Sequence, residues 1–172
     1  MMMANLREAT LTDNMEAKMN QQLGCTLGIV AGSNASFGIV HAIGSVNFNL
    51  KGPHGYKCGV LLPHAMEFNM PVCKQKFAQL ATILGEVPYQ KTTSELANCF
   101  VRQVKQLLIE LDFPSKFGPE NLSKDKIPEL LKEVKRNSPP FQDFNLRNVT
   151  DHDIVRLCEH ALKGWELDSI HH

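Results

Sequence analysis

The sequence has no surplus of charge of either sign. Its 172 residues contain 18 Lys and Arg against 18 Asp and Glu, so the formal net charge is +0 when histidine is neutral. A protein that binds nucleic acid by neutralising phosphates needs a basic surface. The composition therefore argues against a nucleic-acid partner.

Long apolar runs are missing as well. The most apolar stretch, residues 23–30, contains glycines and a threonine and is far shorter than the about 20 residues needed to cross a bilayer. The first eight residues, Met-Met-Met-Ala-Asn-Leu-Arg-Glu, lack the basic start and the apolar segment of a secretory signal. We therefore expect no membrane span and a cytoplasmic protein.

The cysteines form no Cys-x-x-Cys pair, which excludes the commonest zinc and dithiol motifs. Their number is odd and they are scattered along the chain, at Cys25, Cys58, Cys73, Cys99 and Cys158. We expect reduced thiols that pack as small apolar side chains. Cys58 and Cys73, which follow the histidine pair described next, are the two whose positions we follow in the structure.

Alternating β-branched runs are also missing, and apolar residues recur instead at three- and four-residue spacing. This pattern predicts an all-α protein, a helical bundle of about seven helices, in a single domain over residues 1–172. The expected helices span residues 13–31, 35–45, 56–69, 73–84, 93–111, 127–136 and 151–162.

Several residues predict where these helices begin and end. Asp13 is the expected N-cap of the first helix, with Glu16 as its capping-box partner. Pro63 is expected to kink or divide the third, because proline removes a backbone donor. Gly85 is expected to end the helix over residues 73–84. Thr150 is the expected N-cap of the last helix, which Gly164 is expected to end. One apolar face of the first helix consists of Met15, Met19, Leu23 and Leu27. We expect its two methionines to pack in the core.

Two of the seven histidines have a spacing that suits a metal site. His41 falls inside the expected helix 35–45, and His54 follows the loop 46–53 directly before the next helix. A helix-loop-helix hairpin can bring both imidazoles to one point, and neutral imidazole is a good ligand for Fe(II) or Zn(II). This spacing is common in helical proteins, so ordinary packing stays open as the alternative.

Three blocks of sequence surround this pair. Residues 34–44 read Asn-Ala-Ser-Phe-Gly-Ile-Val-His-Ala-Ile-Gly, residues 52–55 read Gly-Pro-His-Gly, and residues 61–69 read Leu-Leu-Pro-His-Ala-Met-Glu-Phe-Asn. In this order they resemble three consecutive blocks of the iron-containing, or group III, alcohol dehydrogenases. Residues 148–154, Asn-Val-Thr-Asp-His-Asp-Ile, are similar to the family's last loop and helix, so the resemblance covers nearly the whole chain.

The resemblance implies the helical C-terminal domain of an enzyme that transfers hydride between an alcohol or aldehyde and NAD(P). It makes His41 and His54 two of the family's metal ligands, for Fe(II) or alternatively Zn(II), and assigns no catalytic residue. The metal would act as a Lewis acid. NAD(P) would bind only through the N-terminal nucleotide-binding domain, which has no counterpart here.

The chain departs from the family at two points. The family's other two ligands are an aspartate and a histidine one helical turn apart, whereas the only aspartate before His41 is Asp13, followed four residues later by Ala17. Where the family often has a histidine four residues after the first ligand, this chain has Ser45. We therefore expect inactivity alone and an upstream half, or a homo-oligomer, as partner. A non-catalytic helical domain or interaction subunit derived from the family is the alternative.

The other histidines have ordinary explanations. We expect a local hydrogen bond between His64 and Glu67, which share a helix face, and surface positions for His152 and His160. No role is assigned to the terminal pair, His171 and His172.

Overall fold

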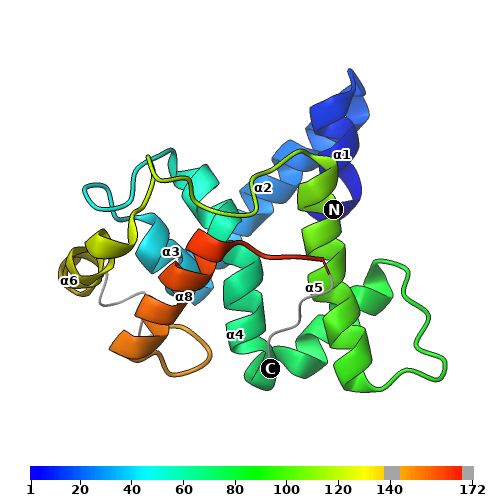
Figure 1. Ribbon diagram of the computed structural model, residues 1–172. Helices are drawn as coiled ribbons and strands as arrows, with labels where there is room; N and C mark the ends of the chain where they lie inside the picture. Colours follow the sequence, from blue (N-terminus) through cyan, green and yellow to red (C-terminus); the bar gives the residue numbers. More distant parts are fainter. Residues whose placement is uncertain (138–143, 168–172) are drawn as a thin grey trace. The chain divides into compact units, whose positions relative to one another are not determined.

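The computed structural model describes residues 1–137 and 144–167, and all of the regular structure in these ranges is helical (Figure 1). The predicted all-α class is confirmed. His171 and His172, to which we assign no role, lie outside the described residues. None of the described helices combines the length and apolar character that a bilayer crossing requires. The elements are α1 (Met2–Leu11), α2 (Met15–Ala35), α3 (Ile39–Gly44), α4 (His54–Ile83), α5 (Thr93–Glu110), the 3-10 turn η1 (Lys124–Lys126), α6 (Ile127–Asn137) and α8 (Asp151–Lys163).

The described chain forms two compact units. The first consists of Met1–Ser36 and Lys74–Phe113, and the second of Phe37–Cys73 with the described part of the chain after Phe113. Both histidines of the candidate metal pair belong to the second unit. The expectation of a single domain stays a prediction.

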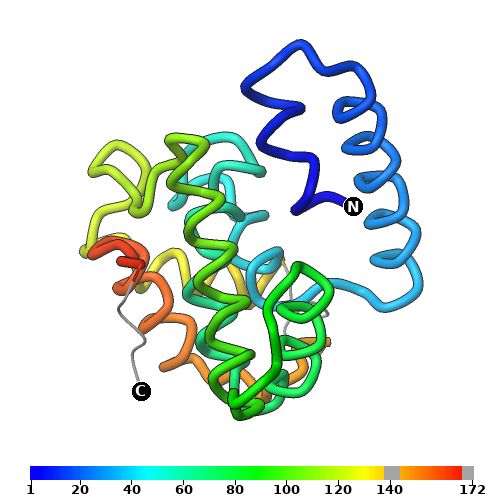
Figure 2. The backbone as a smooth tube through the Cα atoms, turned by 90° about the vertical axis from the view of Figure 1, so that its right-hand side faces the viewer, coloured from blue at the N-terminus to red at the C-terminus, as the bar shows by residue number. Residues whose placement is uncertain are grey.

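In the first unit, α1 runs alongside α2 (Figure 2). Small residues allow this approach: Ala17 is buried, and a Cβ added to Gly24 would lie 2.6 Å from Cγ of Met2. The sequence did not predict α1. The expected burial of two α2 methionines is wrong, since Met15 is 67% exposed and Met19 63% exposed.

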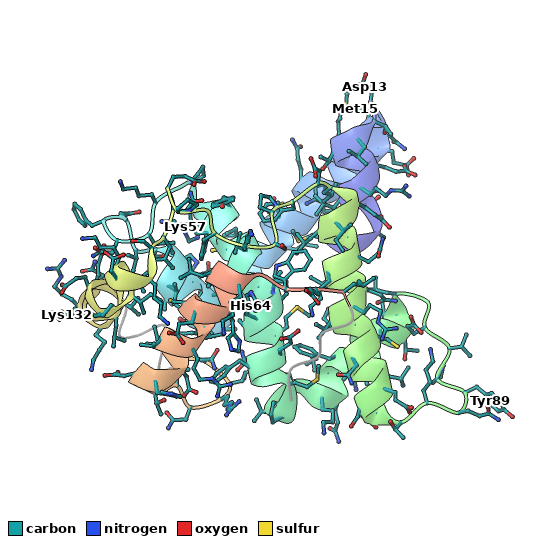
Figure 3. The ribbon with its side chains drawn as sticks, viewed as in Figure 1. Asp13, Met15, Lys57, His64, Tyr89 and Lys132 are labelled. Carbon is teal, nitrogen blue, oxygen red and sulfur yellow. The ribbon has the colours of Figure 1, made fainter. Side chains whose placement is uncertain are left out.

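The start of α2 corrects a predicted cap. The side chain of Asn14, rather than Asp13, accepts a hydrogen bond from the Ala17 amide at 3.1 Å, so the helix begins at Met15. Asp13 instead pairs with Lys18 at 3.0 Å on the surface. Figure 3 shows Asp13 and Met15 at the turn between α1 and α2. An N-cap side chain bonds to an amide two or three residues further along the chain, and Ala17 is three residues after Asn14.

Helix α4 corrects a second prediction, because it is one helix of 30 residues that continues through Pro63 and Pro71. The expected division into residues 56–69 and 73–84 is therefore wrong. A proline removes one backbone donor and leaves the others in place. Pro63 is fully buried, and burial of its ring contributes packing that offsets the lost bond.

Other predicted helix ends are confirmed. Gly85 has φ 101° just after α4, where the Glu86 amide donates to the Ala81 carbonyl at 3.0 Å. Thr150 caps α8 in a capping box with Asp153, and Gly164, with φ 94°, follows its last residue.

Helix α3 is shorter than the expected 35–45. Ser36, with φ 62°, ends α2, and Gly38 is the N-cap of α3. The carboxamide of Asn145 holds this end of α3: its Oδ1 lies 3.4 Å from the Ile39 amide, and its Nδ2 donates to Oδ1 of Asn69 on α4 at 2.8 Å. A Cβ on Gly38 would lie 2.8 Å from Oδ1 of Asn145, so glycine is required for this approach.

The connection between α3 and α4 is held by a buried carboxylate. Glu133 on α6 is 4% exposed, and its Oε1 accepts the amide hydrogens of Asn47 at 3.1 Å and Phe48 at 3.3 Å. Its Oε2 accepts from the amide of Asn49 at 3.3 Å and from Nδ2 of the same residue at 3.0 Å. Burial alone would raise the pKa of Glu133, but these four hydrogen bonds outweigh it and hold that pKa below its ordinary value.

Asn121 holds the other half of the same connection. Its carbonyl accepts from the Lys51 amide at 2.9 Å, and its Oδ1 accepts from the hydroxyl of Tyr56 at 2.8 Å. The loop that separates the two candidate ligands is thus tied at both ends to the rest of its unit.

We predict that Glu133→Gln lowers the free energy of unfolding by about 1–3 kcal/mol near neutral pH, because an amide group replaces a charged acceptor of four hydrogen bonds. The folded-state pKa of Glu133 lies below its unfolded value, so its contribution is complete above the unfolded value. It disappears as the pH falls through the folded value. The difference between wild type and variant in urea unfolding should therefore narrow on acidification.

Glu129→Gln is the matched control, since Glu129 is an exposed residue of the same helix that pairs with Lys132 at 3.0 Å. This change should cost less than about 1 kcal/mol. An equal loss of unfolding free energy in the two variants would contradict the role proposed for the hydrogen bonds of Glu133.

Candidate metal centre

His41 lies on α3 and is half-buried. Its ring stacks on that of Phe37, with centroids 4.6 Å apart and an interplanar angle of 22°. Burial lowers the pKa of His41, and the neighbouring His54 lowers it further. The imidazole is therefore held towards its neutral form, which is the form that binds metal.

His54 is the first residue of α4, and its exposed ring meets that of His41. The two centroids are 4.6 Å apart at an interplanar angle of 72°. Nδ1 of His54 lies 3.1 Å from the carbonyl oxygen of Gly44, the last residue of α3. When Nδ1 carries the proton and donates it to this carbonyl, the lone pair of Nε2 is free for a ligand.

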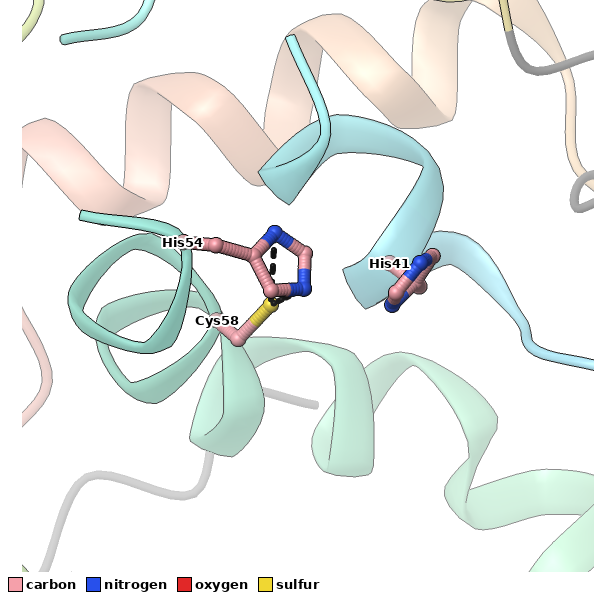
Figure 4. Close-up of side chains that lie close together, drawn as sticks. All are labelled: His41, His54 and Cys58. Carbon is pink, nitrogen blue, oxygen red and sulfur yellow. Dashed lines mark hydrogen bonds between the residues drawn. The ribbon is translucent and has the colours of Figure 1, made fainter. Parts of the chain in front are cut away.

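Cys58 joins the two histidines from one turn further along α4. Its Sγ lies 3.5 Å from Nε2 of His54 (Figure 4), and one ligand atom from each of the three residues lies within 4.8 Å of the other two. Sequence reasoning marked Cys58 only as a nearby thiol. The missed signal is the spacing His54-x-x-x-Cys58, which puts both side chains on one face of a helix.

Gly44 makes room for this thiol. A Cβ at Gly44 would lie 2.7 Å from Sγ of Cys58, so a larger residue would require the thiol or the end of α3 to shift. Glycine at this position also lets its carbonyl oxygen meet the ring of His54.

Lys57 lies beside the centre and is 1% exposed. Its ammonium group donates to the carbonyl of Val46 and, at 3.4 Å, to Oδ1 of Asn47, so it also holds the loop. Burial lowers the pKa of Lys57 and raises that of the Cys58 thiol, while the nearby Lys57 charge partly opposes the second effect. Without a metal, Cys58 is therefore a thiol at neutral pH.

The family's remaining site positions are different here. Ser45 is the C-cap of α3 and offers a half-buried hydroxyl instead of an imidazole. Asp13 is an exposed surface partner of Lys18, and Ala17 four residues later is an apolar side chain.

The other histidines lie away from this centre. His64 lies on α4 and is 3% exposed (Figure 3). Its ring centroid lies 6.0 Å from that of His160 on α8. His160 is half-buried for this reason rather than fully on the surface, whereas His152 is exposed as expected. The hydrogen bond predicted between His64 and Glu67 stays a prediction.

The donor set fits a divalent transition metal. Imidazole nitrogen suits Zn(II), Fe(II) and related ions, and a cysteine sulfur adds a soft ligand. Three protein ligands leave one tetrahedral position open, as in catalytic rather than purely structural sites. The ligand role of His41 and His54 stays a prediction, but the structure brings their rings together as the predicted hairpin requires.

Comparison with known proteins gives one family. The sequence model described as "Fe-containing alcohol dehydrogenase family, C-terminal" matches residues 1–162. Among curated proteins, the 1,3-propanediol dehydrogenase of Citrobacter freundii is 26% identical over 159 residues, which are 91% of this chain and 41% of that protein. The lactaldehyde reductase of Escherichia coli K12 is 25% identical over 159 residues, 92% of this chain and 41% of that protein.

Solved structures agree in fold. The chain matches a 1,3-propanediol oxidoreductase with a TM-score of 0.85 at 23% identity, over 93% of this chain and 42% of the other. It matches an alcohol dehydrogenase from Oenococcus oeni with a TM-score of 0.83 at 27% identity, over 92% and 42%. The chain thus spans about two-fifths of the length of the relatives it matches. It belongs to the Fe-containing alcohol dehydrogenase family and corresponds to that family's C-terminal domain.

Proposed function

We propose that this chain is the metal-binding part of an alcohol or aldehyde oxidoreductase, with His41 and His54 as ligands of one divalent metal. The observation that carries the proposal is the 4.6 Å separation of two imidazole rings that come from opposite ends of a loop. The family match and the small-molecule alcohols and aldehydes named for its relatives support the same reaction class.

The side chains of this unit would orient the ligands and limit their motion. The carbonyl of Gly44 selects the His54 tautomer whose Nε2 can bind, and stacking on Phe37 restricts the ring of His41. When bound, a divalent ion supplies Lewis-acid polarisation of an alcohol or carbonyl oxygen. Neither histidine serves as a general base, because ligation occupies the lone pair that a base would use.

The remaining functions of a dehydrogenase would come from another chain or segment. No glycine-rich phosphate loop after a strand occurs in the sequence, so NAD(P) would be held by a separate nucleotide-binding part. The chain's two-fifths share of its relatives' length agrees with this division. We therefore infer little or no turnover by the chain alone.

A specific observation favours a second candidate, a non-catalytic interaction subunit. Residues of α2 at four-residue spacing are apolar and exposed by 48–67%: Met15, Met19, Leu23 and Leu27. An apolar stripe of this kind suits a protein contact, with an upstream half or with a second copy of the chain.

We predict that the chain binds Fe(II) or Zn(II) and that His41→Ala and His54→Ala each weaken this binding by at least about tenfold. Removing a residue that only orients a metal ligand typically lowers metal affinity by about 10–100-fold. Removing a ligand itself should lower the affinity by at least about as much. Anaerobic equilibrium dialysis with metal analysis would measure it.

His152→Ala is the control, since His152 is exposed on α8, and it should bind as wild type does. Equal metal content in wild type and in both ligand variants would contradict the proposed pair.

We predict that hydride transfer appears only when the metal-loaded chain is mixed with a nucleotide-binding half, such as the upstream part of a matched 1,3-propanediol dehydrogenase. Nicotinamide absorbance with simple alcohols and aldehydes would follow the reaction. The same mixture made with the His54→Ala variant should give at least about tenfold less activity. If mixtures that form a stable complex show no turnover, the interaction-subunit alternative holds instead.

A further inference from the structure

We infer that Cys58 is a third protein ligand at this centre, binding as a thiolate, so that the chain carries a soft His-His-Cys site suited to Zn(II) or Co(II). The inference rests on the proposed metal-binding function of His41 and His54. It goes beyond that function by adding a ligand and a metal preference that the two histidines alone do not imply.

The distance between Cys58 and His54 matches tetrahedral coordination. Metal–sulfur bonds of about 2.3 Å and metal–nitrogen bonds of about 2.0–2.1 Å at tetrahedral angles put sulfur and nitrogen about 3.5 Å apart. The distance between Sγ of Cys58 and Nε2 of His54 is 3.5 Å. Because Sγ also lies 4.0 Å from Nδ1, the thiol sits beside the ring, and a side-chain rotation would bring it to an ion held on the lone pair of Nε2.

The hydrogen bond to Gly44 directs the correct nitrogen to the metal. Nδ1 of His54 faces the Gly44 carbonyl at 3.1 Å, and the other nitrogen, Nε2, is the one nearer to the thiol. Metal-binding histidines usually donate their second ring N–H to a carbonyl or carboxylate in this way. This hydrogen bond leaves the lone pair of Nε2 free for an ion that Sγ can reach after a side-chain rotation.

His41 closes the set from the neighbouring helix. Its ligand atom lies within 4.8 Å of those of His54 and Cys58, which is longer than a tetrahedral edge but within reach of a small side-chain rotation. Gly44 provides the space that keeps α3 close enough, since a Cβ there would lie 2.7 Å from Sγ. The half-buried thiol and the exposed His54 leave the centre accessible to an ion from solvent.

Binding would convert the Cys58 thiol to a thiolate and release one proton to solvent for each ion bound. A thiolate donor favours softer ions over Fe(II) more than imidazoles alone do. The three ligands leave one position for an oxygen ligand from outside the chain.

The experiment is anaerobic titration of the full chain with Co(II), whose bond to a thiolate gives a sulfur-to-metal charge-transfer band in the near ultraviolet. We expect this band in wild type at one Co(II) per chain, its loss in Cys58→Ser, and its retention in Cys25→Ser. Cys25 is an exposed thiol on α2 and serves as the matched control. In competition with a chromophoric chelator, Cys58→Ser should bind Zn(II) at least about tenfold more weakly than wild type.

A second measurement needs no variant and so does not depend on the folding of Cys58→Ser. Zn(II) should slow the alkylation of Cys58 by iodoacetamide, mapped by mass spectrometry, at least about tenfold without slowing that of Cys25. The ligand set is overturned if Co(II) binding depends on His41 and His54 while no thiolate band forms and Cys58 stays reactive. In that result the proposed function stands. If wild type binds neither ion, both the ligand set and the proposed function fail.

Discussion

The candidate centre depends on a buried carboxylate that never touches it. His41 and His54 lie on either side of a loop. The backbone amides of this loop need hydrogen-bond acceptors, from water or from the protein. Glu133 accepts the amide hydrogens of three successive loop residues, and Asn121 holds the residues that follow. These hydrogen bonds hold the path of the loop that joins the two histidines.

Close approach of helices is the second constraint. At three close approaches a glycine leaves no room for a Cβ: Gly24 faces Met2, Gly38 faces Asn145, and Gly44 faces Cys58. At Gly44 the contact has a chemical as well as a packing consequence. It lets one carbonyl orient an imidazole while the adjacent thiol approaches the same ring.

The proposed ligands all come from one hairpin of the second unit. Ser45 stands where the family often has a histidine. The two histidines proposed as ligands belong to a hairpin that Glu133, Asn121 and Asn145 hold within one unit. The thiol of Cys58, one helical turn from His54, is the proposed third donor from the same hairpin.

The sequence by itself determined the helical class, the ends of helices at Gly85, Thr150 and Gly164, and the pair of histidines worth pursuing. These features are local: they depend on periodicity, capping side chains and residues free to adopt positive φ, all of which act within a few positions. It misplaced the N-cap of α2 by one residue, because Asp13 and Asn14 are both good caps and only the helix start distinguishes them. It also ended one helix at residue 69 and began the next at residue 73, whereas α4 continues through Pro71 as it does through Pro63.

Only the tertiary structure decided that His54 and Cys58 on α4 meet His41 on α3, and that Glu133 holds the loop between the two histidines. The reason is sequence separation. Glu133 lies more than 80 positions from the amides it accepts, and no local pattern encodes that contact. The position of a thiol relative to an imidazole on another helix likewise depends on how closely α3 and α4 pack, which is set by the space left at Gly44.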